Sequence, residues 1–193
     1  MKKTALLAFF TFLFLAGCAG INFSQLSPDA KDFHPKTIAV MPATVGEHES
    51  SRDIIDGVVS ASLLKSKRYD NIVDSTTIKT QISNSTELAN ELAFYIQKIN
   101  TLGVSDPQSV AKLRESIEAE AILLTYVSSW GYGRADGNKV ARVGLGLKLV
   151  DSSTGRIVWK ASHELIEEYT IIRPDQAKMA DKLMRMLIKE MPR

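Results

Sequence analysis

The sequence contains a single cysteine, Cys18, whose thiol is the most reactive group among the side chains of the chain. The thiolate form is a strong nucleophile, so this cysteine could accept a diacylglyceryl group. A lone cysteine also excludes a disulfide framework and a cysteine-rich zinc site. Leu15, Ala16 and Gly17 precede Cys18, and the small residues among them would let the backbone enter a peptidase cleft. The alternative for this residue is a buried core cysteine.

The start of the chain has the organisation of a secretory signal peptide. Met1-Lys2-Lys3 is basic, and the uncharged residues 4–16 that follow are too few to span a bilayer. The run Leu15-Ala16-Gly17-Cys18 resembles the lipobox of bacterial lipoproteins. That resemblance implies a signal peptide over residues 1–17 and fatty-acid chains, such as palmitate, on Cys18. Inner-membrane lipoproteins of enterobacteria carry Asp directly after the lipidated cysteine. This chain has Ala19 at that position, and in this it resembles an outer-membrane lipoprotein. The alternative is an ordinary signal peptide with an incidental cysteine.

The sequence has three histidines that could serve as metal ligands or general bases, and they are His34, His48 and His163. No two of them have the spacing of a metal site on a helix. His163 has Ser162 and Glu164 beside it on an expected strand. Because alternate strand residues point to opposite faces, these three cannot form a local catalytic triad. Residues 47–49 (Glu-His-Glu) could bind a metal weakly, and solvated loop charge is the simpler interpretation. The sequence therefore predicts no catalytic residue, no metal and no cofactor.

Three aromatic residues are the candidate partner-binding group. Tyr126, Trp130 and Tyr132 have the same parity, with Ser128 between them, so they should share one face of a single strand. An exposed aromatic strip of this kind would dock a partner protein or a neighbouring subunit. The alternative is that helices cover this face.

Composition describes an ordinary globular protein, with 193 residues, 45% of them hydrophobic and 24% charged. Lys and Arg number 24 against 22 Asp and Glu. Two of the basic residues, Lys2 and Lys3, lie in the expected signal peptide, so the remaining chain is electrically balanced. A balanced chain has no large basic surface, and nucleic acid is therefore not an expected partner.

The first part of the domain reads as a β-α-β unit. Residues 19–36 are polar and rich in serine and proline, so residues 18–35 are expected to be a lipidated cysteine and tether and residues 36–193 a single domain. An apolar run over 37–41 predicts a strand buried on both faces. Helical spacing of apolar residues over 52–66 and a second strand over 69–73 follow. These two strands should run parallel.

The sequence after residue 73 predicts helices, followed by strands that form an antiparallel meander. Helices are expected over 76–82, 87–101 and 107–118, and strands over 121–134, 142–149 and 157–165, with turns at 136–138 and 152–155. The chain ends in an amphipathic helix from about Pro174. Its methionines are expected in the core, although adaptable Met surfaces also suit protein contacts. The predicted fold class is α+β, with one mixed sheet, a three-strand antiparallel meander and helices packed on it.

Three stretches carry a resemblance to known proteins: residues 36–42 (KTIAVMP), 118–124 (EAEAILL) and 147–159 (LKLVDSSTGRIVW). Asp151 and Thr154 can bond the backbone of the turn in the last stretch, Gly155 supplies a positive φ, and Trp159 returns to the core. In this order and spacing, the three stretches resemble a group of envelope lipoproteins that includes CsgG, PelC, LpoB and small DUF799-type lipoproteins. The amino-terminal domain of TolB shares the fold. The resemblance covers about residues 36–190.

The resemblance implies a non-catalytic accessory or scaffold protein of cell-envelope assembly or secretion. It would be lipid-anchored on the periplasmic face of the outer membrane, would contact other envelope proteins and would form a homo-oligomer. The alternatives are a subunit of an outer-membrane secretion ring of the curli or exopolysaccharide type, and an activator of a peptidoglycan synthase. A hydrolase of wall or lipid is the rival from another class. Residues 74–118 are too polar to supply membrane-crossing hairpins, which weighs against a pore.

Overall fold

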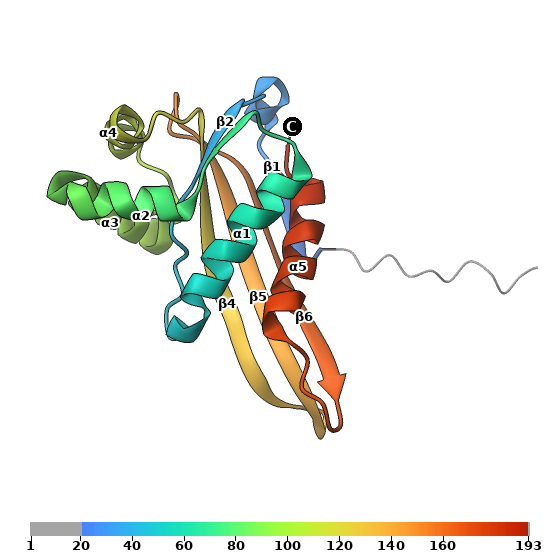
Figure 1. Cartoon of the computed structure of the whole chain (residues 1–193). Helices are drawn as coiled ribbons and strands as arrows, with labels where there is room; N and C mark the ends of the chain where they lie inside the picture. Colours follow the sequence, from blue (N-terminus) through green and yellow to red (C-terminus); the bar gives the residue numbers. More distant parts are fainter. Residues whose placement is uncertain (1–20, 193) are drawn as a thin grey trace, which may run out of the picture.

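The computed structural model describes residues 21–192. Figure 1 shows the arrangement of its strands and helices. The strands are β1 (Phe23–Leu26), β2 (Thr37–Val40), β3 (Asn71–Val73), β4 (Ala121–Ala135), β5 (Asn138–Asp151) and β6 (Ile157–Tyr169). The helices are α1 (Arg52–Ser66), α2 (Ser75–Asn84), α3 (Thr86–Leu102), α4 (Pro107–Ile117) and α5 (Gln176–Glu190), with short 3-10 helices at Pro28–Asp32 and Glu49–Ser51.

All six strands form one mixed sheet in the order β1-β6-β5-β4-β2-β3. β2 runs parallel to both β3 and β4, while β4, β5 and β6 form an antiparallel meander. The predicted fold class is therefore confirmed, including the parallel pairing across the first β-α-β unit. The predicted helices all exist, with ends within a few residues of the expected ones.

Helices cover the sheet on both sides and create two hydrophobic clusters. On one face, α1 and α5 pack against β2, β4, β5 and β6, and Trp159 is almost fully buried there. On the other face, α2, α3 and α4 pack against β2 and the first residues of β4. β2 lies between the clusters, so Ile38 and Ala39 are both fully buried, as predicted for a strand covered on two sides. Figure 1 shows the two sets of helices on opposite sides of the strands.

The prediction of a loop over residues 19–36 is wrong for the middle part of that segment. Phe23–Leu26 forms β1, which pairs antiparallel with β6 and gives the sheet an additional edge strand. The residues alternate as F-S-Q-L, and Ser24 accepts a hydrogen bond from the indole nitrogen of Trp159 at 3.2 Å. Propensity alone did not indicate a strand this short, because its stability comes from an open edge of β6 that only the tertiary fold supplies.

The two turns of the meander form as predicted. Asp136 and Gly137 both have positive φ, at 49° and 84°, as the tight hairpin between β4 and β5 requires. In the second turn, Asp151 accepts hydrogen bonds from Ser153 and Thr154 at 2.7–2.8 Å, and Gly155 has φ 69°. A side chain at Gly155 would also meet Pro107 of α4 at 2.5 Å. This turn therefore fixes α4 against the end of the sheet.

The last helix, α5, is a core element. Its buried stripe includes Met179, Met184 and Leu187, which confirms the predicted core role of the methionines at those positions. Asp175 caps the helix by accepting hydrogen bonds from the backbone of Ala177 and Lys178 at 2.9 and 3.3 Å. Within residues 21–192, no helix combines the length and apolar character needed to cross a bilayer.

Candidate partner-binding surface

Part of one sheet face is not covered by a helix of the described chain. The second hydrophobic cluster reaches the sheet only as far as Leu124 and Val150, and the strands continue well beyond the helices (Figure 1). Strand register places twelve residues on the uncovered part, which we call the open face. They are Phe23 and Gln25 of β1, Tyr126 and Ser129 of β4, Arg142, Gly144, Gly146 and Lys148 of β5, and Lys160, Ser162, Glu164 and Ile166 of β6.

A β-bulge divides the predicted aromatic strip between the two faces of the sheet. The register shifts between Val127 and Ser129, so one extra residue is accommodated there and the alternation of side chains reverses. Tyr126 consequently lies opposite Gly146 on the open face, while Trp130 and Tyr132 lie on the face of α5. The expectation that Tyr126, Trp130 and Tyr132 share one face is therefore wrong, because same-parity reasoning does not hold across a bulge.

Tyr126 lies flat over a glycine. A Cβ built on Gly146 would lie 1.9–2.2 Å from atoms of the Tyr126 side chain, so only glycine allows the ring to occupy this place. The side chains of Ser128 and Ser129 likewise occupy the space in which a side chain at Gly144 would begin. Because Gly144 and Gly146 of β5 carry no side chains, the side chains of β4 can lie across the middle of the open face.

Two lysines give the open face its charge. Lys148 is partly buried, lies 5.9 Å from the centroid of the Tyr126 ring and donates a hydrogen bond to the carbonyl oxygen of Ile99 at 3.3 Å. Burial, and then the charge of Lys160, lower the pKa of Lys148. Lys160 is exposed and lies 5.7 Å from the centroid of Phe23. Neither lysine has an ion-pair partner among the described carboxylates, so both are available to an acidic ligand.

Three side chains from neighbouring strands form a small polar network on the same face. Ser129 donates a hydrogen bond to Glu164 at 2.6 Å, and Arg142 lies 3.6 Å from the other oxygen of that carboxylate. His163 projects to the opposite face, where its ring contacts Asn22. The prediction that Ser162, His163 and Glu164 cannot form a triad is confirmed by this register.

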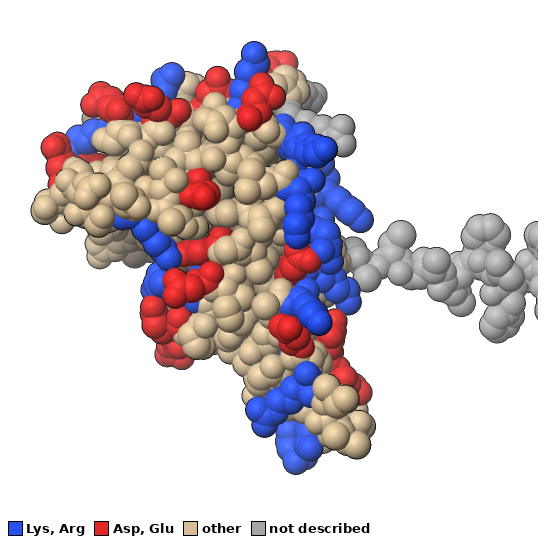
Figure 2. Space-filling view, in the orientation of Figure 1, with Lys and Arg blue, Asp and Glu red and all other residues tan. Residues whose placement is uncertain are grey.

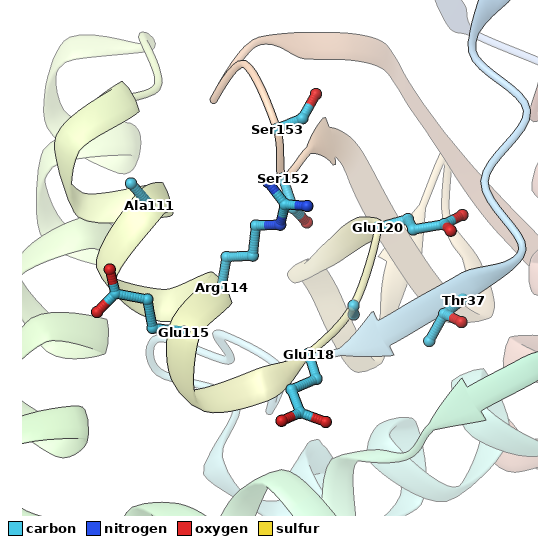
Figure 3. A pocket seen from close by; sticks show the side chains of 9 residues that line it. Thr37, Ala111, Arg114, Glu115, Glu118, Glu120, Ser152 and Ser153 are labelled. Carbon is cyan, nitrogen blue, oxygen red and sulfur yellow. The ribbon is translucent and has the colours of Figure 1, made fainter.

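A hollow also lies away from the open face, between the end of α4 and the turn after β5. It has a volume of about 550 Å³ and is lined by Thr37, Ala111, Arg114, Glu115, Glu118, Ala119, Glu120, Ser152 and Ser153. Figure 3 shows the carboxylates of Glu115, Glu118 and Glu120 pointing in different directions. Glu120 accepts a hydrogen bond from the backbone nitrogen of Lys36 at 2.6 Å. The carboxylates of these three glutamates therefore do not point toward one another in the pocket.

The remaining sequence candidates stay apart. Cys18 and the residues of the lipobox, 15–17, lie outside the described residues. His48 precedes a 3-10 helix, where its carbonyl accepts a hydrogen bond from Ser51, and Glu49 forms an ion pair with Arg52 at 2.6 Å. Across residues 21–192, no three His, Cys, Asp or Glu side chains gather as a metal site would need. The short motif at 47–49 is therefore engaged in local contacts.

Sequence reasoning missed the open face itself. The alternation of Arg142, Gly144, Gly146 and Lys148 with apolar residues was a visible signal, because it marks one side of β5 as polar and flat. What was not visible is that β1 extends this side and that the bulge brings Tyr126 and Ser129 onto it.

Comparisons with known proteins support the fold. Neither a protein-family model nor a curated protein matches this chain in sequence. Among solved structures, the PelC dodecamer from Paraburkholderia phytofirmans is similar over 89% of this chain and 99% of that chain, with 15% identity and a TM-score of 0.55. Lipoprotein GNA1162 from Neisseria meningitidis is similar over 81% and 97%, with 17% identity and a TM-score of 0.55. The hypothetical protein CT253 from Chlamydia trachomatis is similar over 79% and 93%, with 11% identity and a TM-score of 0.56.

Proposed function

We propose that this chain is a lipid-anchored accessory protein of the bacterial cell envelope that works by binding other proteins through its open face. It would sit on the periplasmic face of the outer membrane and perform no catalysis. The lipobox-like sequence around Cys18 supports the anchor, and structural similarity to PelC and to lipoprotein GNA1162 supports the envelope setting.

The observation that carries this proposal is an uncovered sheet face with lysines that lack carboxylate partners. Phe23 is 43% exposed and Ile166 is 46% exposed, so aromatic and aliphatic surface lies beside Lys148 and Lys160. Mixed surfaces of this kind suit protein contacts better than a small-molecule site, because no deep cavity is needed. The partner is expected to present carboxylates next to apolar side chains.

An anchor makes such a surface effective without high intrinsic affinity. Acyl chains confine the domain to a layer beside the membrane, which raises its effective concentration toward other membrane-bound proteins. One acyl chain binds a membrane only marginally, and two or more hold stably. Contact through the open face then needs to supply specificity more than strength.

Crosslinking in cells tests the proposal. A photoreactive residue at Lys160 should capture one or a few envelope proteins, whereas the same residue at Leu64, which is 59% exposed on α1, should not. The charge reversal Lys160→Glu should reduce capture from a neighbouring position, Gln25, by about tenfold, since a favourable charge contact would become repulsive. Equal capture from Lys160 and Leu64 would contradict a specific open face.

The anchor is tested separately. Radioactive palmitate should label the wild-type protein and should not label Cys18→Ala. If both forms capture the same partners with equal yield, the anchor plays no part in the function. If palmitate does not label the wild-type protein but crosslinking at Lys160 is retained, the proposed anchor is wrong and the proposed binding surface still holds.

A second candidate is assembly of the chain with itself, as in a secretion ring. PelC is described as a dodecamer, and its fold covers nearly all of the described chain. In this case the Lys160 crosslinks would join two copies, and the product would have twice the mass of the chain. Identification of the captured partner also tests the resemblance to CsgG, LpoB and DUF799-type proteins. A partner from curli export or from peptidoglycan synthesis would support the corresponding role.

A hydrolase is the rival explanation, and it has a direct test. The purified protein should show no turnover of peptidoglycan, phospholipid or glycoside substrates. Turnover that disappears in Ser129→Ala or Glu164→Gln would overturn the non-catalytic proposal and assign chemistry to the network on the open face.

A further inference from the structure

Two isoleucines at one end of the molecule are almost completely exposed. Ile171 is 90% exposed and Ile172 is 85% exposed, in the loop that joins β6 to α5. Adjacent, fully exposed large aliphatic residues are costly in water and mark surfaces that contact an apolar phase or another molecule. No other large apolar residue in the described chain is as exposed as these two.

The loop that carries the isoleucines is held in place by its neighbours. Tyr132 donates a hydrogen bond to the carbonyl of Pro174 at 2.8 Å and contacts the Tyr169 ring edge-on, with centroids 6.0 Å apart. The Arg173 guanidinium lies 5.1 Å from the centroid of Tyr132, and Lys139 donates to the carbonyl of Thr170 at 3.4 Å. Because the flanking residues are fixed, the isoleucines project from a braced loop. Tyr132, placed on this face by the bulge, thus contributes to the support of the loop.

Charges of both signs surround the loop. Arg134, Lys139 and Arg173 lie on or beside it, together with Asp136, Glu168 and Asp175. Glu168 accepts a hydrogen bond from Asn138, and Asp175 caps α5. Figure 2 shows Lys and Arg side chains at this end of the molecule, next to uncharged surface. Exposed aliphatic residues with lysine and arginine side chains beside them are suited to the headgroup region of a bilayer.

The direction of β1 leads the chain toward the same end of the molecule. β1 is antiparallel to β6 and Phe23 lies opposite Ser162, so the chain before Phe23 leads toward the Tyr169 end of β6. Cys18 precedes Phe23 by five positions, which allows a reach of up to about 17 Å. From Ser162 to Tyr169, β6 advances about 23 Å. A fully extended segment from Phe23 to Cys18 would end within about 6 Å of the Tyr169 end of β6. Acyl chains on Cys18 could then enter the same leaflet as the loop.

We propose that the Ile171–Ile172 loop inserts into the membrane leaflet that holds the acyl chains of Cys18, as a second attachment point. This inference rests on the proposed lipid anchor for its geometry. Two attachment points fix the tilt of the domain, whereas a single flexible anchor leaves it free to rotate. The long axis of β4–β6 then stands away from the membrane and carries the open face with it.

The test uses a fluorescent reporter of polarity. In the lipidated protein the sulfur of Cys18 is blocked, so Ile172→Cys introduces the one free thiol for labelling with NBD. The labelled protein is placed in vesicles of phosphatidylethanolamine and phosphatidylglycerol. The matched control is Leu102→Cys, at a residue 61% exposed at the end of α3, on the opposite side of the sheet.

We expect the emission at position 172 to shift to shorter wavelength in vesicles and to be quenched by nitroxide-labelled lipid, with neither change at position 102. No shift and no quenching at 172 would overturn the proposal. A blue shift that occurs without vesicles and grows with protein concentration would also overturn it, because it would assign the loop to contact between copies. Palmitate labelling of the same preparation shows whether the anchor itself is present, so failure of the loop and failure of the anchor are distinguished.

A second variant measures the contribution of the loop. Ile171→Ser with Ile172→Ser leaves the fold unchanged, because neither side chain is packed in the described chain. In protein that lacks acyl chains through Cys18→Ala, this double change should lower binding to the same vesicles by at least about tenfold. Unchanged binding would contradict insertion of the isoleucines.

Discussion

A glycine and a tyrosine on the open face depend on each other. The ring of Tyr126 occupies the space in which a side chain at position 146 would begin, and Lys148 lies over the same ring. Sequence patterns can identify Gly146 as unusual in a strand, but they cannot identify the residue that fills its place. That residue comes from the neighbouring strand, and its position depends on the register.

Gly146→Ala should lower the free energy of unfolding by about 1–3 kcal/mol, because the tyrosine must leave its position. Gly131→Ala is the matched control, since nothing lies within 4 Å of a Cβ there, and it should change stability by less than about 0.5 kcal/mol. Urea denaturation measures both. Adding Tyr126→Ala to Gly146→Ala should cost less than the sum of the two single changes, because the clash is then removed. Strict additivity would contradict the packing described.

Asp151 controls the turn between β5 and β6. Burial raises its pKa, but hydrogen bonds from Ser153 and Thr154 outweigh this and hold the pKa of the carboxyl below its usual range. Since the folded pKa is lower than the unfolded pKa, ionised Asp151 stabilises the folded state at pH values above about 3.9. That stabilisation is lost as the pH falls through the folded pKa.

Asp151→Asn should therefore lower the free energy of unfolding by about 1–2 kcal/mol at pH 7. The difference from wild type should stay constant down to about pH 5 and shrink below about pH 4. Urea denaturation at pH 7, 5 and 3 checks this. Ser153→Ala, which removes a single donor, is the control and should have a smaller effect. A difference that does not depend on pH would show that the charge of Asp151 is irrelevant.

At the scale of elements, α5 is the helix that covers the meander. Its N-terminal backbone nitrogens are satisfied by Asp175, and the loop before it carries the exposed isoleucines. The cap therefore decides where the loop ends and the helix begins.

Asp175→Ala should lower the melting temperature, at a cost of about 1 kcal/mol, because two backbone donors lose their acceptor. Asp175→Asn keeps a capping oxygen and should lose much less. Circular dichroism during heating measures both variants. Equal loss in the two variants would point to the negative charge of Asp175 near the helix dipole as the stabilising feature instead of the hydrogen bond.

Elements with strong local signals could be predicted from the sequence. The meander strands, the turn at Asp151–Gly155 and the helices with apolar stripes all follow from local periodicity, and the structure confirms them. β1 could not be predicted, since four half-polar residues become a strand only where β6 offers an edge. The bulge between Val127 and Ser129 was hidden for a related reason, because an extra residue leaves no mark on composition. The candidate aromatic strip consequently failed as one surface, although Tyr126 lies on the open face.

At the scale of the whole molecule, positive charge is unevenly distributed. Figure 2 shows a band of Lys and Arg over α5, and its members include Lys178, Lys182, Arg185 and Lys189. Lys182 and Arg185 are paired with Glu167 and Asp181. The band runs along the side of the molecule toward the isoleucine loop. An anionic membrane at that end would attract it.

The length of the segment between the anchor and β1 should set how firmly the domain holds its orientation. Inserting about ten Gly and Ser residues between Ala19 and Gly20 lowers the effective concentration of the loop at the membrane. The NBD emission at position 172 should then move back toward that of the label in water, while palmitate labelling stays unchanged. An unaltered spectrum would show that the loop binds the membrane independently of the anchor.

Pairing of β1 with β6 has a mechanical consequence for anything that pulls on the lipidated end. The ladder pairs from Phe23–Ser162 to Leu26–Trp159 lie along the direction in which the chain leaves the domain. Traction on the acyl chains loads these hydrogen bonds side by side, in shear, instead of opening them one after another like a zipper. The strand can thus act as a force-bearing fastening between the bilayer and the body of the protein.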